Sequence, residues 1–322
     1  MKQVKLLATG LLAACFVITN SCSQTPSNNS TVLGVFVAST PCNDISKAIL
    51  KIPPGTKCEE MKWKLTLYQD PKTFAPSTYK LVYVYGMPKQ GTRGLMEGAK
   101  TIELNGKWGI GKGTRENAEA VVYKLNTDTS PIFLSFLSPD PNLLHLLDDD
   151  KRLVVGNGAF GYTLSRIDPI PPSPARFSSQ TTTSLRLASD SPTVGVFDGR
   201  TSCNSILREL NGISAPGCQR TKWRLTLYQD PGTHLPTTFK LQTVYVAKGD
   251  SLYANTGKWI ISRGTKNDPH ALVYELRLDP SNPEVTLAFL KADDNILFFL
   301  DKDRNLLVGD ADFNYTLNRV RK

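Results

Sequence analysis

The chain of 322 residues contains nearly the same sequence twice. The clearest match is a run of nine residues, WKLTLYQDP at 63–71, which returns as WRLTLYQDP at 223–231. A self-match of this length marks a duplicated structural unit, so we expect two copies of one fold. The duplication also supplies a control, because a residue found in only one copy is a poor candidate for a function that both copies share.

The N-terminus has the pattern of a secretory signal. Lys2 and Lys5 precede an apolar run at 6–18, which is too short to span a membrane as a helix. The segment resembles a bacterial lipoprotein signal, in which a cysteine is lipidated and becomes the mature N-terminus. We favour Cys22 because the small, polar tether expected after an anchor follows it. Cys15, after Leu-Ala-Ala, is the alternative lipidation site, and a plain secreted protein is the other alternative.

The number of cysteines supports this choice. Cleavage before Cys22 would remove one of the six cysteines and lipidate another, which leaves two in each copy at matching positions. In an oxidising envelope such pairs form disulfides. Each would close a loop of about 15 residues and contribute about 3 kcal/mol to stability. Reduced thiols are the alternative, and a zinc site is disfavoured because it usually needs four Cys or His ligands. The predicted disulfides are Cys42–Cys58 and Cys203–Cys218.

Composition divides the chain into domains. A segment rich in proline, serine and threonine separates the two copies and has the composition of a linker. The net charge of +9 is mildly basic, and the sequence has no stripe of basic residues, so nucleic-acid binding is disfavoured. The predicted boundaries are 1–21 for the signal peptide, 22–31 for the tether, 32–166 for the first copy, 167–192 for the linker and 193–322 for the second copy.

Each copy has the pattern of an all-β fold. Large apolar residues recur at every second position at 63–68, 79–85 and 272–279, which predicts strands with one inward face. A helical pattern occurs once per copy, after the first cysteine, at 43–50 and 204–210. Six to eight consecutive strands in about 130 residues predict an antiparallel meander, which removes its edges by closing into a barrel. The sequence does not reveal whether the two barrels pack together.

The order of motifs in both copies resembles the N-terminal domain of NlpE-type envelope lipoproteins. The first copy carries these motifs as Gly34-Val35-Phe36, Pro41-Cys42, Leu65-Thr66-Leu67, Tyr79-Lys80-Leu81, Gly106-Lys107-Trp108, Leu147-Asp148 and Tyr162-Thr163-Leu164-Ser165-Arg166. The second copy carries them as Gly195-Val196-Phe197, Ser202-Cys203, Leu225-Thr226-Leu227, Phe239-Lys240-Leu241, Gly257-Lys258-Trp259, Leu300-Asp301 and Tyr315-Thr316-Leu317-Asn318-Arg319.

This resemblance implies tandem lipocalin-like barrels on an outer-membrane lipoprotein, with links to copper tolerance, adhesion and envelope-stress signalling. The Cys-x-x-Cys pair of that family is absent, because Asn43-Asp44-Ile45 follows Cys42 and Asn204-Ser205-Ile206 follows Cys203. Any metal or redox role of that pair is therefore not carried over. We expect no metal site and no cofactor.

The sequence favours a protein that is not an enzyme. It lacks Gly-x-Ser-x-Gly and His-Glu-x-x-His motifs, and no histidine recurs in both copies to act as a general base. The expected function is sensing, adhesion or scaffolding from the outer membrane, with the barrels facing the periplasm and an envelope protein as partner. The alternative is a carrier of small apolar ligands such as lipids. In that case a cavity lining is expected from Trp63, Trp108, Trp223 and Trp259, which otherwise pack in the barrel cores.

Overall fold

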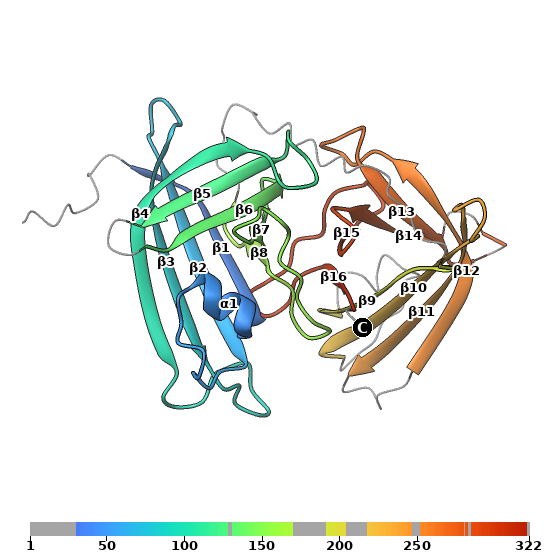
Figure 1. Ribbon diagram of the computed structural model, residues 1–322, viewed down its shortest axis with the longest axis horizontal. Coiled ribbons are helices and arrows are strands. Elements are labelled where there is room, and N and C mark those ends of the chain that lie inside the picture. The colour runs from blue at the N-terminus through green and yellow to red at the C-terminus, as the bar shows by residue number, and fades with distance from the viewer. Residues whose placement is uncertain are drawn as a thin grey trace, which may run out of the picture.

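The chain forms two closed antiparallel barrels in tandem (Figure 1). The computed structural model describes residues 30–127, 131–169, 191–203, 218–246, 252–279, 281–282 and 285–320. The predicted signal peptide, both candidate lipidation cysteines and most of the predicted linker lie outside these described residues. The all-β prediction is confirmed, and so is the prediction of a meander closed into a barrel in each copy.

Barrel 1 is an eight-stranded meander in which each strand pairs with the next and β8 closes onto β1. Its strands are β1 (Thr31–Pro41), β2 (Glu60–Gln69), β3 (Pro76–Gly86), β4 (Lys100–Lys112), β5 (Val121–Thr127), β6 (Phe133–Asp140), β7 (Leu143–Leu147) and β8 (Thr163–Arg166).

Barrel 2 repeats this topology, with β16 closing onto β9. Its strands are β9 (Thr193–Thr201), β10 (Arg220–Gln229), β11 (Pro236–Val246), β12 (Leu252–Arg263), β13 (Leu272–Arg277), β14 (Thr286–Lys291), β15 (Ile296–Leu300) and β16 (Thr316–Arg319).

The repeated Gln-Asp-Pro motif forms the turn that joins the second and third strands of each barrel. The Asp70 side chain accepts hydrogen bonds from the backbone N–H groups of Lys72 and Thr73, and Asp230 does the same in barrel 2. The turn also needs one left-handed residue, and Phe74 and His234 take this conformation with φ of 57° and 58°. The repeated aspartate thus stabilises the same turn in both barrels.

One short helix, α1 (Asp44–Ile49), follows the first cysteine as predicted. The Asn43 side chain caps its N-terminus by accepting from the backbone N–H of Ser46, whose hydroxyl in turn accepts from the backbone N–H of Asn43. The helix predicted at 204–210 lies outside the described residues. No helix in the described part of the chain is long and apolar enough to cross a membrane.

Both predicted disulfides are present. Cys42 is bonded to Cys58 and Cys203 to Cys218, with Cα–Cα distances of 5.6 and 6.0 Å. Each bond ties the segment after the first strand of its barrel to the start of the second strand. The first cysteine of each pair is almost completely buried.

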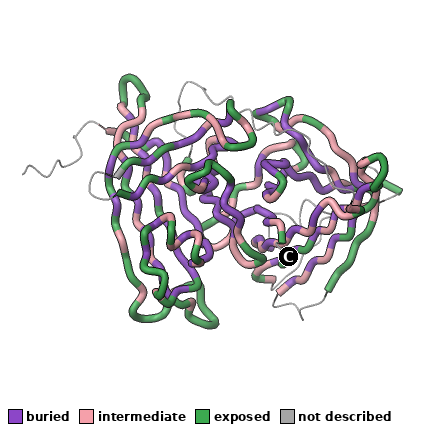
Figure 2. Tube along the Cα trace, viewed as in Figure 1, coloured by how far each residue is buried: buried purple, intermediate pink, exposed green. Residues whose placement is uncertain are grey.

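The two barrels pack against each other through their outer surfaces. In β7 and β15 every residue is buried, although alternate residues of a barrel strand normally face solvent. Inward residues such as Leu144 and Leu297 join the core of their own barrel, whereas Leu143 and Ile296 point outward into an apolar cluster shared by the two barrels. Figure 2 shows this buried zone between the barrels. The remaining cluster residues are Ala120, Val122, Leu137, Leu147, Leu153, Val155, Ala271, Val273, Ala288, Leu290, Ala292, Phe298, Leu300 and Leu306.

The contact between the barrels has an approximate two-fold axis. Thr163 and Thr316 occupy equivalent positions in the two copies, and their hydroxyl oxygens hydrogen-bond to each other at 2.8 Å. The equivalent rings of His145 and Phe298 also meet, with 5.6 Å between their centroids. Residues that are equivalent in the repeat thus meet one another, which is the mark of an isologous interface.

Two hydrogen bonds beside the axis repeat the same symmetry. The backbone N–H of Gly156 donates to the Asn318 side chain at 2.8 Å, and that of Gly309 donates to the Ser165 hydroxyl at 3.0 Å. Gly156 corresponds to Gly309 in the repeat, and Ser165 corresponds to Asn318. The two barrels are therefore arranged like the subunits of a symmetric dimer joined in one chain.

The buried His145 makes this interface sensitive to acid. Its ring nitrogens contact the Thr163 hydroxyl and the Val154 carbonyl, and burial lowers its pKa to about 4. In the unfolded chain a histidine has a pKa of about 6.5. Between these two values the unfolded chain binds a proton that the folded protein does not. Folded stability contributed by this site is therefore lost as the pH falls below about 6.5.

We predict that His145→Phe, which introduces the residue of the second copy, removes this acid sensitivity. Between pH 7 and pH 5, the wild type should lose about 2 kcal/mol more of its free energy of unfolding than the variant. Chemical denaturation at both pH values measures this difference. Burial raises the pKa values of Asp140 and Asp293 to about 6, which favours the folded state as the pH falls, but both proteins share this effect. An identical pH dependence in wild type and variant would contradict the prediction.

Candidate functional site

The four tryptophans lie in the barrel cores. Each is at most 6% exposed, and each ring N–H has an acceptor. Trp63 and Trp223 donate to the hydroxyls of Thr40 and Thr201. Equivalent tryptophans thus have equivalent partners, as the repeat predicts.

The second tryptophan pair ties one strand to the end of another. Trp108 donates to the Tyr68 carbonyl and Trp259 to the Tyr228 carbonyl, both at 2.7 Å. Aromatic and aliphatic side chains surround all four indoles in the two core clusters. Trp223 alone among the four also borders the outer groove described below.

The described residues hold no group of three or more His, Cys, Asp or Glu side chains arranged to bind a metal ion. Cys42, Cys58, Cys203 and Cys218 are engaged in disulfides. His145 is buried with both ring nitrogens in hydrogen-bonding contact, so its ring does not reach a substrate.

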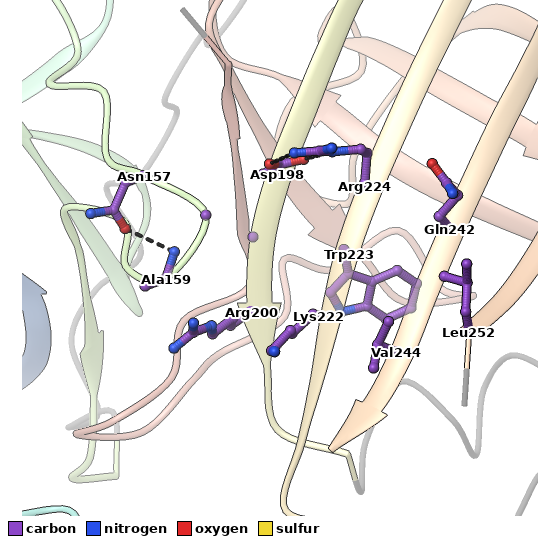
Figure 3. A pocket seen from close by; sticks show the side chains of 12 residues that line it. Asn157, Ala159, Asp198, Arg200, Lys222, Trp223, Arg224, Gln242, Val244 and Leu252 are labelled. Atoms are coloured by element: carbon purple, nitrogen blue, oxygen red, sulfur yellow. Dashed lines mark hydrogen bonds and ion pairs between the residues drawn. The ribbon is translucent and has the colours of Figure 1, made fainter. Parts of the chain in front are cut away.

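A groove of about 550 Å³ lies on the outer face of barrel 2, where a loop of barrel 1 approaches it (Figure 3). Outward residues of β9 to β12 form one side, and the β7–β8 loop of barrel 1 forms the other. Gly158 of this loop lies against Asp198, since a Cβ atom at Gly158 would come within 3.4 Å of that side chain. The lining residues are Asn157, Gly158, Ala159, Asp198, Gly199, Arg200, Lys222, Trp223, Arg224, Gln242, Val244 and Leu252.

The groove is strongly cationic. Arg200 and Lys222 pair across β9 and β10, and their side chains lie together below the loop in Figure 3. Arg220, two residues before Lys222 on the same face of β10, lies beside the groove and not in its lining, and its charge is close to Arg200. Arg224 has a partner, because it makes two hydrogen bonds to Asp198 at 2.8 and 2.7 Å.

No acidic side chain of the described residues pairs with Arg200, Arg220 or Lys222. The Nε atoms of Arg200 and Arg220 are buried and have no hydrogen-bond acceptor within the described chain. Burial and the nearby charge of Arg220 both lower the pKa of Arg200. Among the described residues, these three positive charges therefore lie close together without an acidic partner.

The equivalent site on barrel 1 is closed by an ion pair. There Ser39 and Lys62 occupy the paired positions of Arg200 and Lys222. The β15–β16 loop of barrel 2 places Asp312 on Lys62 at 2.9 Å and on Arg93 at 3.1 Å. The Ser39 hydroxyl also donates to the Ala311 carbonyl of this loop.

The two loops have the same backbone turn but differ in one side chain. Asn157 and Asp310 each accept hydrogen bonds from the backbone N–H groups two and three residues later. The equivalent of Asp312 in barrel 1 is Ala159, which carries no carboxylate. The loop of barrel 1 therefore lies where it could close the groove, but it lacks the carboxylate that would pair with Lys222.

A second acid is also replaced. Glu60 lies 3.2 Å from Lys62 in barrel 1, and its equivalent in barrel 2 is Arg220. Burial lowers the pKa of Lys62, but Asp312 and Glu60 more than offset this and raise it. Lys222 has neither of these two acids beside it.

Sequence reasoning missed this groove because it discounted residues that occur in one copy alone. The difference was visible in the alignment of the two copies, at positions where a residue in one copy is replaced by a residue of different charge in the other. Those positions are Ser39 and Arg200, Glu60 and Arg220, and Asp312 and Ala159.

Comparison of the chain with protein-family models, curated proteins and solved structures found no match. The resemblance to NlpE-type domains therefore stays a prediction drawn from the order of sequence motifs.

We predict that Asp312→Ala weakens the contact between the barrels. Lys62 and Asp312 are 27% and 20% exposed, so their charges are partly shielded from solvent. Loss of the carboxylate should lower the free energy of unfolding by about 1 kcal/mol, and by less at high salt. Denaturant titration measures this loss. Asp149→Ala, at an exposed turn of barrel 1, is the matched control and should leave stability unchanged. Equal stability of Asp312→Ala and wild type would refute the prediction.

Proposed function

We propose that the chain is a non-catalytic, lipid-anchored envelope protein that acts in sensing, adhesion or scaffolding through two NlpE-like barrels. The signal-like N-terminus, with Cys22 followed by a polar tether, supports the anchor. The order of motifs in both copies supports a place in the outer membrane, with the barrels facing the periplasm. An envelope protein is the expected partner.

The observation that carries this proposal is the packing of both barrel interiors. Large side chains such as Tyr83, Phe136, Trp259 and Phe289 are almost completely buried within the two core clusters. Interiors filled in this way leave the outer surfaces for recognition. The shared interface favours the same role, because it holds the two barrels as one body with fixed outer faces.

The packed interiors also weigh against the alternative of an apolar-ligand carrier. A carrier needs an open cavity, with aromatic side chains along its wall. The indole N–H groups of Trp63, Trp108, Trp223 and Trp259 are instead engaged with protein oxygens. The groove of about 550 Å³ lies outside barrel 2 and is cationic.

We predict that Cys22, and not Cys15, carries the lipid. Cells fed an alkyne-tagged fatty acid should label the wild type and Cys15→Ser but not Cys22→Ser. Intact-mass measurement of the purified protein then identifies the lipidated N-terminus. Label lost only in Cys15→Ser would identify the other cysteine as the anchor, and an unlabelled wild type would refute the anchored protein.

Native mass spectrometry of the protein, purified from its own membrane in mild detergent, distinguishes the scaffold function from the carrier function. The scaffold proposal predicts the mass of the lipidated chain without a retained apolar molecule. A stoichiometric apolar ligand would support the carrier instead. Turnover of an ester, glycan or peptide substrate that is lost in a single-residue variant would contradict the proposal of a non-catalytic protein.

A further inference from the structure

The cationic groove of barrel 2 has the features of a ligand site, and neither the lipid anchor nor a scaffold role requires it. Arg200 and Lys222 occupy directly paired positions on β9 and β10. Like charges at paired positions destabilise a sheet unless an opposite charge offsets them. Barrel 1 avoids this repulsion, because it has Ser39 in place of Arg200.

Two unpaired arginine nitrogens, one in the groove and one beside it, indicate that a hydrogen-bond acceptor is missing. The Nε atoms of Arg200 and Arg220 are buried without an acceptor, and a buried donor without a partner is costly. Arginine side chains satisfy carboxylate and phosphate oxygens through several hydrogen bonds at once. A bound oxyanion would supply these acceptors and offset the repulsion in one step.

Barrel 1 provides a template for the position of that oxyanion. There the Asp312 carboxylate lies 2.9 Å from Lys62, and the loop that carries it fills the site. In barrel 2 the equivalent loop residue is Ala159, and the groove of about 550 Å³ remains beside Lys222. A ligand oxyanion at this place would take the role that Asp312 has in barrel 1.

The number of charges favours a phosphate over a carboxylate. Arg200 and Lys222 line the groove and the charge of Arg220 lies near Arg200, and no acidic side chain in the described part of the chain pairs with them. A phosphate monoester, which carries up to two negative charges, matches this excess of positive charge better than a carboxylate does. The same groove continues along Gln242 and Val244 to Leu252, whose side chain is 61% exposed. This apolar end offers contact to the organic part of a phosphate ester.

We propose that this groove binds the phosphate group of a small phosphate ester at Arg200 and Lys222, with Arg220 beside Arg200 and the organic part of the ligand toward Val244 and Leu252. The phosphate is the shared recognition element, whether it belongs to a soluble ester or to a lipid headgroup. Ala159, in place of an aspartate, keeps the site open.

Isothermal titration calorimetry on the mature protein in detergent tests this proposal with three probes. They are inorganic phosphate, glycerol 1-phosphate and dihexanoyl phosphatidic acid below its micellar concentration. We expect saturable binding of at least one probe that weakens as salt is raised. Binding of inorganic phosphate identifies the phosphate as sufficient, binding that begins with glycerol 1-phosphate shows that the organic part of a soluble ester contributes, and binding of the lipid alone identifies a lipid headgroup. Absence of binding by all three probes overturns the proposal.

Two variants locate the site. Ala159→Asp places a carboxylate where barrel 1 has one, and should weaken binding by about tenfold or more while the melting temperature holds or rises. Lys222→Gln should weaken binding to a similar extent. The matched control is Lys62→Gln, which makes the same change in the equivalent site of barrel 1, where Asp312 pairs with Lys62. It should leave phosphate binding unchanged. Unaltered binding by Ala159→Asp, or an equal loss in Lys62→Gln, would show that the groove is not the site.

Discussion

The rest of the structure depends on the apolar contact between the outer faces of the two barrels. Strands β7 and β15 are buried on both faces, because their inward residues fill a barrel and their outward residues fill the shared cluster. Burial of apolar surface is the dominant favourable term in such association. The Thr163–Thr316 hydrogen bond lies at the centre, where residues equivalent in the repeat meet. This contact fixes one barrel against the other and brings a loop of each onto the outer face of its neighbour.

The same interface creates two equivalent contacts, and a difference in sequence makes one closed and the other open. Symmetry presents two equivalent loops to two equivalent sheet faces, so the same backbone arrangement occurs twice. On barrel 1 Asp312 pairs with Lys62 and the contact is closed. On barrel 2 Ala159 leaves Lys222 without that partner, and the groove stays open. A duplicated chain can thus keep one site closed by an ion pair and leave the equivalent site open, and the proposed phosphate site rests on this difference.

Much of the fold could be predicted from the sequence, because the signals are local. Apolar residues at every second position predicted the strands, the helical pattern at 43–50 predicted α1, and matching cysteines predicted both disulfides. The packing of the barrels was not predicted. The sequence signal for this packing is the continuous apolar runs of β7 and β15. A strand with one solvent-exposed face would instead alternate apolar and polar residues. Two-sided burial depends on a partner far away in sequence, and the cationic groove depends on that packing in turn, so neither could be read from one segment alone.

A cysteine pair at the symmetry axis tests the central claim most directly. In Thr163→Cys/Thr316→Cys, with a protease site inserted in the linker between residues 178 and 184, the two barrels should form a disulfide across the interface. After cleavage, non-reducing electrophoresis should show one full-size band that separates into two halves on reduction. Each single cysteine variant serves as a control and should give two halves under both conditions. If the double variant also gives only halves without reductant, the two barrels do not meet at these threonines.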